Sequence, residues 1–191
     1  MTTTKQTAMD TVYQIKITLK DSKPPIWRRI QVAGDISLAS LHWVLQYVMG
    51  WENSHLHQFI IDDEEYSSHE YELQDFKDET LDEEKFRLNQ LVASEGAKFV
   101  YQYDFGDDWE HVLVVEKILA DQKTDHPVCL AGARACPPED CGGIWGYGEL
   151  LQAVRDPKHK EHKELLDWAG GRFDPEALDL DAINKKLRKF K

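Results

Sequence analysis

The sequence predicts an α+β fold in a single domain, in which a mixed sheet of antiparallel hairpins is packed by helices, with more helices at the C-terminus. Three observations support this prediction. Residues 98–118 contain two β-rich runs around a turn, residues 11–20 alternate apolar and polar side chains, and helical patterns gather after residue 145 without strands between them. A length of 191 residues fits one domain.

The segment 98–118 (KFVYQYDFGDDWEHVLVVEKI) is the strongest hairpin signal. Aromatic and β-branched residues fill both arms, and Gly106 is expected to supply the positive φ of a tight turn between them. Ionisable and aromatic side chains crowd the tip of this hairpin: Tyr103, Asp104, Asp107, Asp108, Trp109 and His111. The segment therefore predicts a polar site as well as a folded hairpin.

The first half of the chain reads as strands around one helix. Residues 11–20 predict a half-buried strand and residues 26–32 a second strand that pairs back, with Arg28 and Arg29 on opposite faces.

Residues 37–49 predict a helix, because Ser37 can cap its start and Gly50 stands where a terminating glycine belongs. A strand over 55–61 follows, which would project His55 and His57 from one face.

The acidity of the chain is local. The formal net charge is −12, and residues 62–85 hold twelve Asp or Glu and two Lys, which gives −10 for this segment alone. We expect an exposed loop or weak hairpin there. Residues 121–143, rich in Pro, Gly and Cys, lack periodicity and predict a functional loop. Helices are expected over 86–93, 146–155, 159–169 and 180–190.

Composition predicts a cytoplasmic protein without a membrane partner. No apolar run approaches a membrane span, the first ten residues lack a signal sequence, and the three cysteines are expected to stay reduced. Residues 1–10 are expected to be a flexible tail, and residues 11–191 to form the domain.

Several strings resemble one known family. They are Pro24-Pro25-Ile26-Trp27-Arg28-Arg29, Leu41-His42, Gly50-Trp51, residues 55–59 (HLHQF), residues 103–111 (YDFGDDWEH), residues 134–143 (RACPPEDCGG), Gly146-Tyr147 and residues 173–176 (FDPE). The chain resembles the root-inducing-plasmid open-reading-frame-three-like (pRiA4b ORF-3-like) family over about residues 13–187. Ile144 departs from the proline expected after the double glycine. The resemblance implies an α/β-roll fold and an association with plasmids and mobile elements.

Members of that family also carry the label of a transposon resolvase, which the residues of this chain do not support. A serine resolvase needs a nucleophilic serine among clustered arginines, and Ser22 and Ser37 lack that setting. A tyrosine recombinase needs a late tyrosine, and none follows Tyr147. We therefore do not expect recombinase catalysis.

Two groups of residues could bind zinc or another divalent metal. In the first, the strand pair His55 and His57 would be joined by His111 and a carboxylate of Asp107 or Asp108. In the second, Cys136 and Cys141 have a spacing found in zinc sites, and Cys129 could be a third ligand. The alternative is ordinary packing of the histidines and buried, reduced thiols.

The carboxylates of Glu139 and Asp140 could approach the hairpin tip and hold Mg²⁺ or Mn²⁺ there. The alternative is that they cap turns and pair with Arg134. No nucleophile and base stand out as a pair.

A nucleic-acid contact is a further hypothesis. Lys185, Lys186, Arg188 and Lys189 form one basic face of the last helix, although such a face is more often simply solvated.

The residues favour a non-catalytic binding or accessory module, with a protein, peptide or nucleic acid as partner. We expect a pocket with walls of Tyr103, Trp109, Trp145 and Tyr147 and a floor of His57, Asp107, His111, Glu139 and Asp140. The alternative is a divalent-metal-dependent hydrolase or nuclease that uses the same floor.

Overall fold

A computed structural model describes residues 10–69 and 80–189. Its strands are β1 (Thr11–Leu19), β2 (Trp27–Ala33), β3 (His57–Ile61), β4 (Glu64–Ser67), β5 (Leu81–Asp82), β6 (Lys98–Tyr103), β7 (Trp109–Ala120) and β8 (Val128–Ala133). Its helices are α1 (Leu38–Met49), the 3-10 helix η1 (Glu83–Lys85), α2 (Leu88–Leu91), α3 (Gly143–Arg155), α4 (His162–Trp168) and α5 (Leu180–Leu187).

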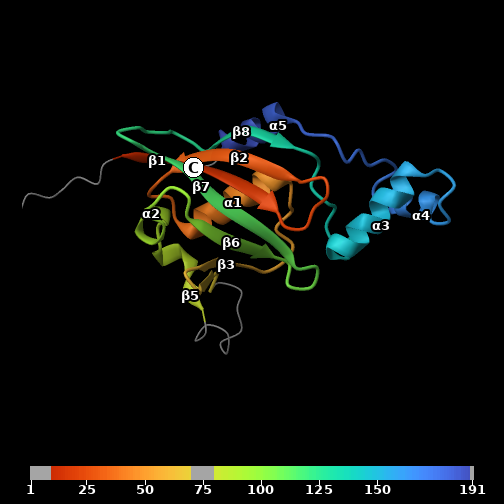
Figure 1. Ribbon diagram of the computed structural model, residues 1–191, viewed down its shortest axis with the longest axis horizontal. Helices are drawn as coiled ribbons and strands as arrows, with labels where there is room; N and C mark the ends of the chain where they lie inside the picture. The colour runs from red at the N-terminus through yellow and green to blue at the C-terminus, as the bar shows by residue number, and fades with distance from the viewer. Residues whose placement is uncertain (1–9, 70–79, 190–191) are drawn as a thin grey trace, which may run out of the picture.

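All eight strands form one sheet in the order β5-β4-β3-β6-β7-β1-β2-β8. Neighbouring strands run antiparallel except β4 and β5, which are parallel. This mixed sheet with separate helices confirms the predicted α+β class (Figure 1).

The hairpin of β6 and β7 forms as predicted, but its turn differs from the expected one. Tyr103 and Trp109 close the ladder, and Asp104 and Asp108 take the positive φ values, 58° and 55°, instead of Gly106. Aspartate tolerates this conformation because its short side chain can bond to the nearby backbone. The Oδ1 atom of Asp104 accepts hydrogen bonds from the N–H groups of Gly106 (2.9 Å) and Asp107 (3.3 Å).

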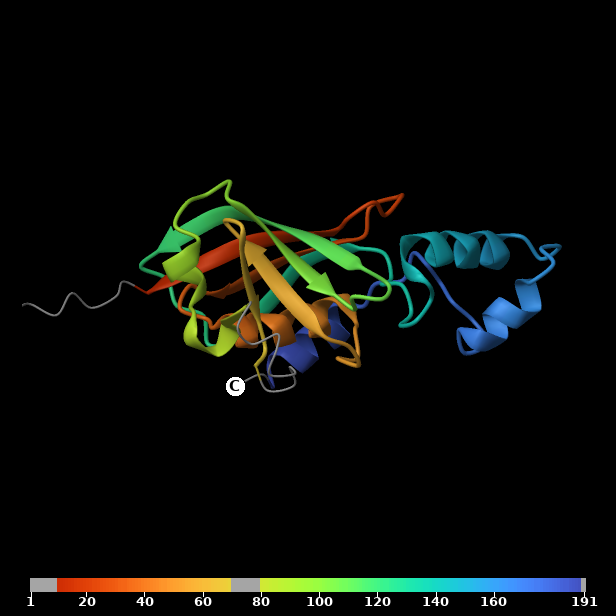
Figure 2. The same cartoon turned by 90° about the horizontal axis from the view of Figure 1, so that it is seen from below.

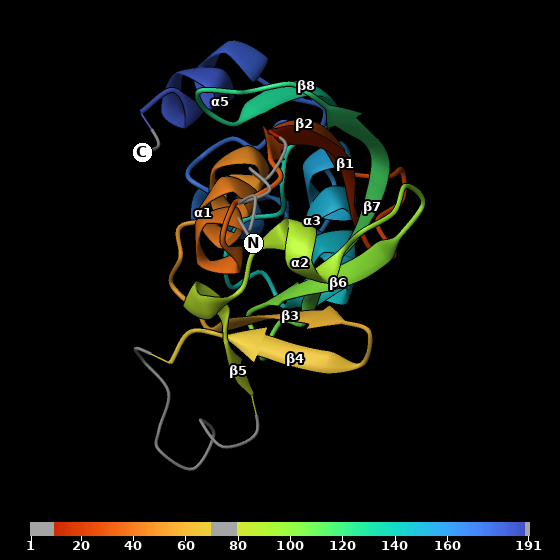
Figure 3. The same ribbon diagram turned by 90° about the vertical axis from the view of Figure 1, so that its left-hand side faces the viewer.

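The curved sheet wraps around α1 (Figure 3). As predicted, Ser37 caps this helix by accepting a hydrogen bond from the Ser40 N–H at 3.1 Å, and Gly50 ends it with a φ of 104°. The apolar stripe that includes Leu38, Leu41 and Leu45 is fully buried against the sheet. Helix α1 is thus the centre of the core.

Residues 121–143, predicted to lack regular structure, contain strand β8, which pairs antiparallel with β2. Its sequence, VCLAGA, is rich in small residues and has no clear alternation, so the usual strand signal is absent. Helix α5 lies beside β8 (Figure 3), where the side-chain amide of Asn184 bonds to both backbone groups of Cys129.

The acidic segment 62–85 is less exposed than predicted. It supplies β4, β5 and η1, and it buries Tyr66, Ser67 and Glu83. Residues 70–79 of this segment, the predicted tail up to residue 9 and residues 190–191 lie outside the described residues.

Strand β3 begins at His57, two residues later than predicted, so His55 precedes the sheet. The C-terminal helices α3 and α4 extend beyond the end of the sheet (Figure 2). Within residues 10–69 and 80–189, no helix is long and apolar enough to cross a membrane.

Candidate functional site

Three segments that are distant in the sequence meet at one end of the sheet. They are the β6–β7 turn, the segment that precedes β3, and the loop that leads into α3. The Gly142 N–H donates to Oδ2 of Asp107 at 3.0 Å. A Cβ atom on Gly143 would lie 2.6 Å from the Asp107 carbonyl oxygen, so the close approach of loop and turn requires glycine there.

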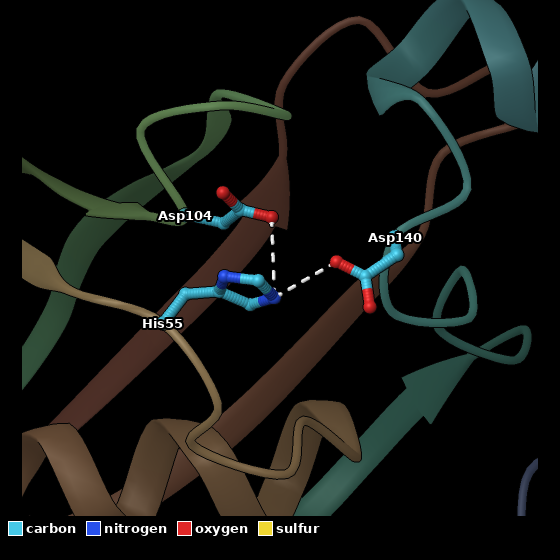
Figure 4. A group of neighbouring side chains, drawn as sticks. All are labelled: His55, Asp104 and Asp140. Carbon is cyan, nitrogen blue, oxygen red and sulfur yellow. Dashed lines mark ion pairs between the residues drawn. The ribbon is translucent and has the colours of Figure 1, made fainter.

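The imidazole of His55 is the centre of this meeting point (Figure 4). Its Nε2 atom lies 3.1 Å from Oδ1 of Asp140, 3.6 Å from Oδ2 of Asp104 and 3.8 Å from Oε2 of Glu139. We call these four side chains the His55 cluster. The Nε2 atom of His55 and the Oε2 atom of Glu139 are buried, and neither has a hydrogen-bond partner within the described residues.

Neighbouring groups fix the carboxylates of the His55 cluster. The Oε1 atom of Glu139 accepts from the Tyr103 hydroxyl (2.9 Å) and from the Glu52 N–H (2.7 Å). Burial, followed by the bond to Glu139, raises the pKa of Tyr103 well above its usual value, so the hydroxyl remains a donor. In both Glu139 and Asp104, one carboxylate oxygen therefore accepts hydrogen bonds from neighbouring groups of the protein. The other oxygen points towards His55.

His111 does not belong to this site, contrary to the predicted pocket floor and metal set. It is fully buried; Trp51 Nε1 donates to its Nε2 at 3.2 Å, and its Nδ1 lies 3.2 Å from the Tyr101 carbonyl oxygen. Burial lowers the pKa of His111 to about 4, so the ring is neutral near pH 7. Both ring nitrogens are engaged, and His111 is part of the core.

His57 lies in a second cluster, separate from His111. Its Nε2 atom lies 2.9 Å from Oε2 of Glu83, and its ring stacks on that of His42 with centroids 3.5 Å apart. His42 bonds to the Tyr101 hydroxyl (2.8 Å) and to Oδ1 of Asn53 (2.9 Å). Burial, and then the charge of His57, lowers the pKa of His42 to about 3.

The stacked histidines border a cavity of about 620 Å³, which we call the histidine pocket. Trp43 and Leu56 contribute to its lining and are 41% and 48% exposed, and Glu84 lies next to Glu83 at the wall. Sequence reasoning missed Trp43, His42 and Glu83. Trp43 falls inside a helical pattern and Glu83 inside an acidic run, so no local signal distinguishes them. His42 is part of the Leu41-His42 string of the family resemblance, but that string assigns no role to the ring.

The four predicted aromatic walls do not enclose one pocket. Trp109 and Trp145 line a cavity of about 390 Å³ with Asp107, but Tyr103 and Tyr147 do not contribute to it. Tyr103 and Trp109 are buried in the core, where Trp51 packs against both rings. Tyr147 is buried in α3 against Phe173, while Trp145 is 86% exposed. Tyr103 and Trp109 face the core because strands alternate their side chains between two faces.

Among the described residues, the predicted zinc cysteines Cys136 and Cys141 belong to no group of three or more side chains close enough to share one cation. Burial raises the pKa of Cys136 well above its usual value and that of Cys141 to about 12, so both are thiols near neutral pH. In the described part of the chain, one group of three or more His, Cys, Asp or Glu side chains is close enough to share a cation, and it consists of His55, Asp104 and Asp140.

Other candidate residues have structural contacts. Arg134 donates to the Pro25 carbonyl oxygen (2.9 Å) and pairs with Glu176 at 3.3 Å instead of the nearby Glu139 or Asp140. Asp108 accepts from the side chain of Gln102. The basic residues Lys185, Lys186, Arg188 and Lys189 lie on and just after α5.

Comparisons with known proteins agree with the resemblance in the motifs. The family model described as plasmid pRiA4b ORF-3-like protein matches residues 11–182. Uncharacterized protein y4hQ of Sinorhizobium fredii is 39% identical over 178 residues, which cover 92% of this chain and 90% of the relative. A crystal structure of a protein of unknown function from Methanosarcina mazei Go1 has a TM-score of 0.80 and 35% identity, and the match covers 93% of this chain and 98% of that chain.

Proposed function

Because this chain belongs to the plasmid pRiA4b ORF-3-like protein family, and its relatives are described as uncharacterized or of unknown function, we propose its function from the site. We propose a cytoplasmic, non-catalytic module that binds a basic segment of a partner polypeptide. The observation that supports this proposal is the histidine pocket, which combines buried and exposed carboxylates with an exposed tryptophan. Its volume of about 620 Å³ is that of a pocket for a small ligand or a few side chains.

The charge of the pocket favours a cationic ligand. Glu83 and Glu84 lie at its wall, and the His55 cluster adds three carboxylates beside it. A Lys or Arg side chain that enters the pocket would gain from these charges, and Trp43 offers a ring face for a cation–π contact. An acidic surface repels the phosphate backbone of nucleic acid, so a basic polypeptide fits this surface better than DNA or RNA.

The available side chains support a binding role over nucleophilic catalysis. The Cys136 and Cys141 thiols are held in the protonated form by burial, and the rings of His42 and His111 are engaged with neighbouring side chains or backbone. An activated nucleophile next to a base, as covalent catalysis requires, is therefore not formed by these groups.

The test is fluorescence anisotropy with labelled peptides of seven to nine residues that contain Arg or Lys, with acidic peptides and oligonucleotides as competing probes. We expect the basic peptides to bind and the other probes to bind weakly at 150 mM salt. Trp43→Ala and Glu84→Gln should each weaken peptide binding several-fold, because they remove a ring contact and a charge. Glu65→Gln, at an exposed carboxylate on β4 outside the pocket, is the matched control.

Two results would overturn the proposal. In the first, oligonucleotides bind instead, and the salt dependence of their affinity flattens when Lys185, Lys186 and Lys189 are neutralised, which would favour the basic face of α5. In the second, a peptide or oligonucleotide probe is cleaved during the titration and Asp104→Asn abolishes the cleavage, which would favour a hydrolase.

A further inference from the structure

We propose that His55, Asp104 and Asp140, with Glu139 beside them, form a binding site for one divalent transition-metal ion, with Zn²⁺ and Mn²⁺ as the expected occupants. This site adjoins the histidine pocket, because His55 also contributes to the lining of that pocket. The proposal does not depend on peptide binding. It rests on the direction in which the ligand atoms point, on their spacing and on the groups that hold them.

The spacing of the atoms suits a single cation. A tetrahedral ion with bonds of 2.0–2.2 Å places neighbouring ligand atoms roughly 3.3–3.6 Å apart. The distances from Nε2 of His55 to the three carboxylate oxygens are 3.1, 3.6 and 3.8 Å. The ligand atoms of His55, Asp104 and Asp140 all lie within 4.8 Å of one another, which requires only a small inward movement around an ion.

A simple ion pair explains the arrangement less well. A protonated imidazole has one proton at Nε2, and that proton can be donated fully to one acceptor. Three carboxylates surround this atom, yet it makes no hydrogen bond of normal geometry within the described residues, and neither does the buried Oε2 of Glu139. Buried polar atoms are nearly always partnered, so two buried atoms without partners at the same point favour a cation as their shared ligand.

The surrounding groups behave as the outer shell of a metal site. The Asp104 side chain is 9% exposed, and its Oδ1 is held by two N–H groups of its own turn, which leaves Oδ2 directed at the centre. The Tyr103 hydroxyl and the Glu52 N–H hold Oε1 of Glu139 in the same way. Hydrogen bonds of this kind orient ligands and strengthen metal binding.

The ligand types select the class of ion. An imidazole nitrogen favours zinc and other transition metals over Mg²⁺ and Ca²⁺, and the carboxylate oxygens suit Zn²⁺ and Mn²⁺. Asp140 is 71% exposed, so the site opens to solvent on its side, where water can complete the coordination. The ion would also offset the repulsion among three carboxylates at the junction of the three segments.

The test is isothermal titration of the EDTA-treated, dialysed full-length protein with ZnCl₂ or MnCl₂, together with the thermal midpoint with and without the ion. We expect a stoichiometry near one and a higher midpoint. His55→Ala, Asp104→Asn and Asp140→Asn should each weaken binding at least ten-fold. Asparagine preserves the turns, because Asp104 and Asp140 have φ values of 58° and 56°, which asparagine tolerates.

His126→Ala and Asp108→Asn are the matched controls, since they remove a histidine and a hairpin-tip aspartate outside the His55 cluster. Unchanged affinity in these controls supports the proposal. Absence of binding at millimolar ion, or binding that survives His55→Ala and is lost in Cys136→Ser or Cys141→Ser, overturns it. Peptide binding to the histidine pocket is measured separately, without added metal. The metal-binding proposal and the peptide-binding proposal are therefore tested independently.

Discussion

At the scale of single residues, two adjacent arginines in β2 show how one strand separates two roles. Arg28 is 1% exposed, and its guanidinium donates to the carbonyl oxygens of Val48, Trp27, Ala133 and Arg134 at 2.7–3.0 Å. Arg29 faces the other side and pairs with Glu116 at 2.6 Å. The alternation of the strand, predicted from the sequence, determines this division.

We predict that Arg28→Met lowers the free energy of unfolding by about 3–5 kcal/mol, because it leaves several buried carbonyl groups without donors. Val48 lies at the C-terminal end of α1, where the helix dipole also favours a cation. Urea denaturation monitored by circular dichroism measures the change.

Arg29→Met is the matched control for this prediction. Its ion pair with Glu116 is partly exposed, with side chains 31% and 23% accessible, so we expect a loss of at most about 1 kcal/mol. Equal losses in the two variants would contradict the assigned role of Arg28.

At the scale of elements, local sequence signals predicted the parts of the fold that carry them. The β6–β7 hairpin, the paired β1 and β2, and the capped helix α1 all have clear periodicity or capping residues, and all form. Strand β8 was missed because its small side chains do not alternate, and its pairing with β2 depends on contacts distant in the sequence.

The candidate site was predicted in part for the same reason. The meeting of the hairpin tip with Glu139 and Asp140 was expected from the sequence, but the histidine that joins them is His55 instead of His57 or His111. Strand β3 begins at His57, so His55 lies in the segment before the sheet and reaches the hairpin tip, and sequence patterns do not specify strand ends to that accuracy.

The junction of α5 and β8 is the basis of the element-scale prediction. The Asn184 amide accepts from the Cys129 N–H (2.8 Å) and donates to the Cys129 carbonyl oxygen (2.9 Å), so it covers part of the edge strand. We predict that Asn184→Ala costs about 1–3 kcal/mol and increases the hydrogen exchange of the Cys129 amide. Lys185→Ala, on the same helix, should change neither by a measurable amount; equal effects of the two would refute this role.

At the scale of the whole molecule, two buried histidines link stability to pH. The pKa of His42 is lowered to about 3 and that of His111 to about 4, in each case chiefly by burial, whereas both rings titrate near 6.5 in an unfolded chain. The folded protein thus keeps both rings neutral at pH 5, and the unfolded chain protonates them. The contribution of each ring is fully present above pH 6.5 and is lost as the pH falls towards its folded pKa.

We therefore predict that the free energy of unfolding falls by roughly 3 kcal/mol per pH unit between pH 6 and pH 4.5, about 1.4 from each histidine, and is nearly constant from pH 7 to 8 as far as these rings are concerned. His111→Gln, whose amide oxygen can still accept from Trp51 Nε1, should be less stable at pH 7.5 but should lose about half of this slope. Urea titrations at four pH values measure both quantities. A slope that is unchanged in His111→Gln would mean that His111 is not kept neutral by burial, and that carboxylates such as Glu116, whose pKa is lowered first by its bond to Arg29, dominate the acid response.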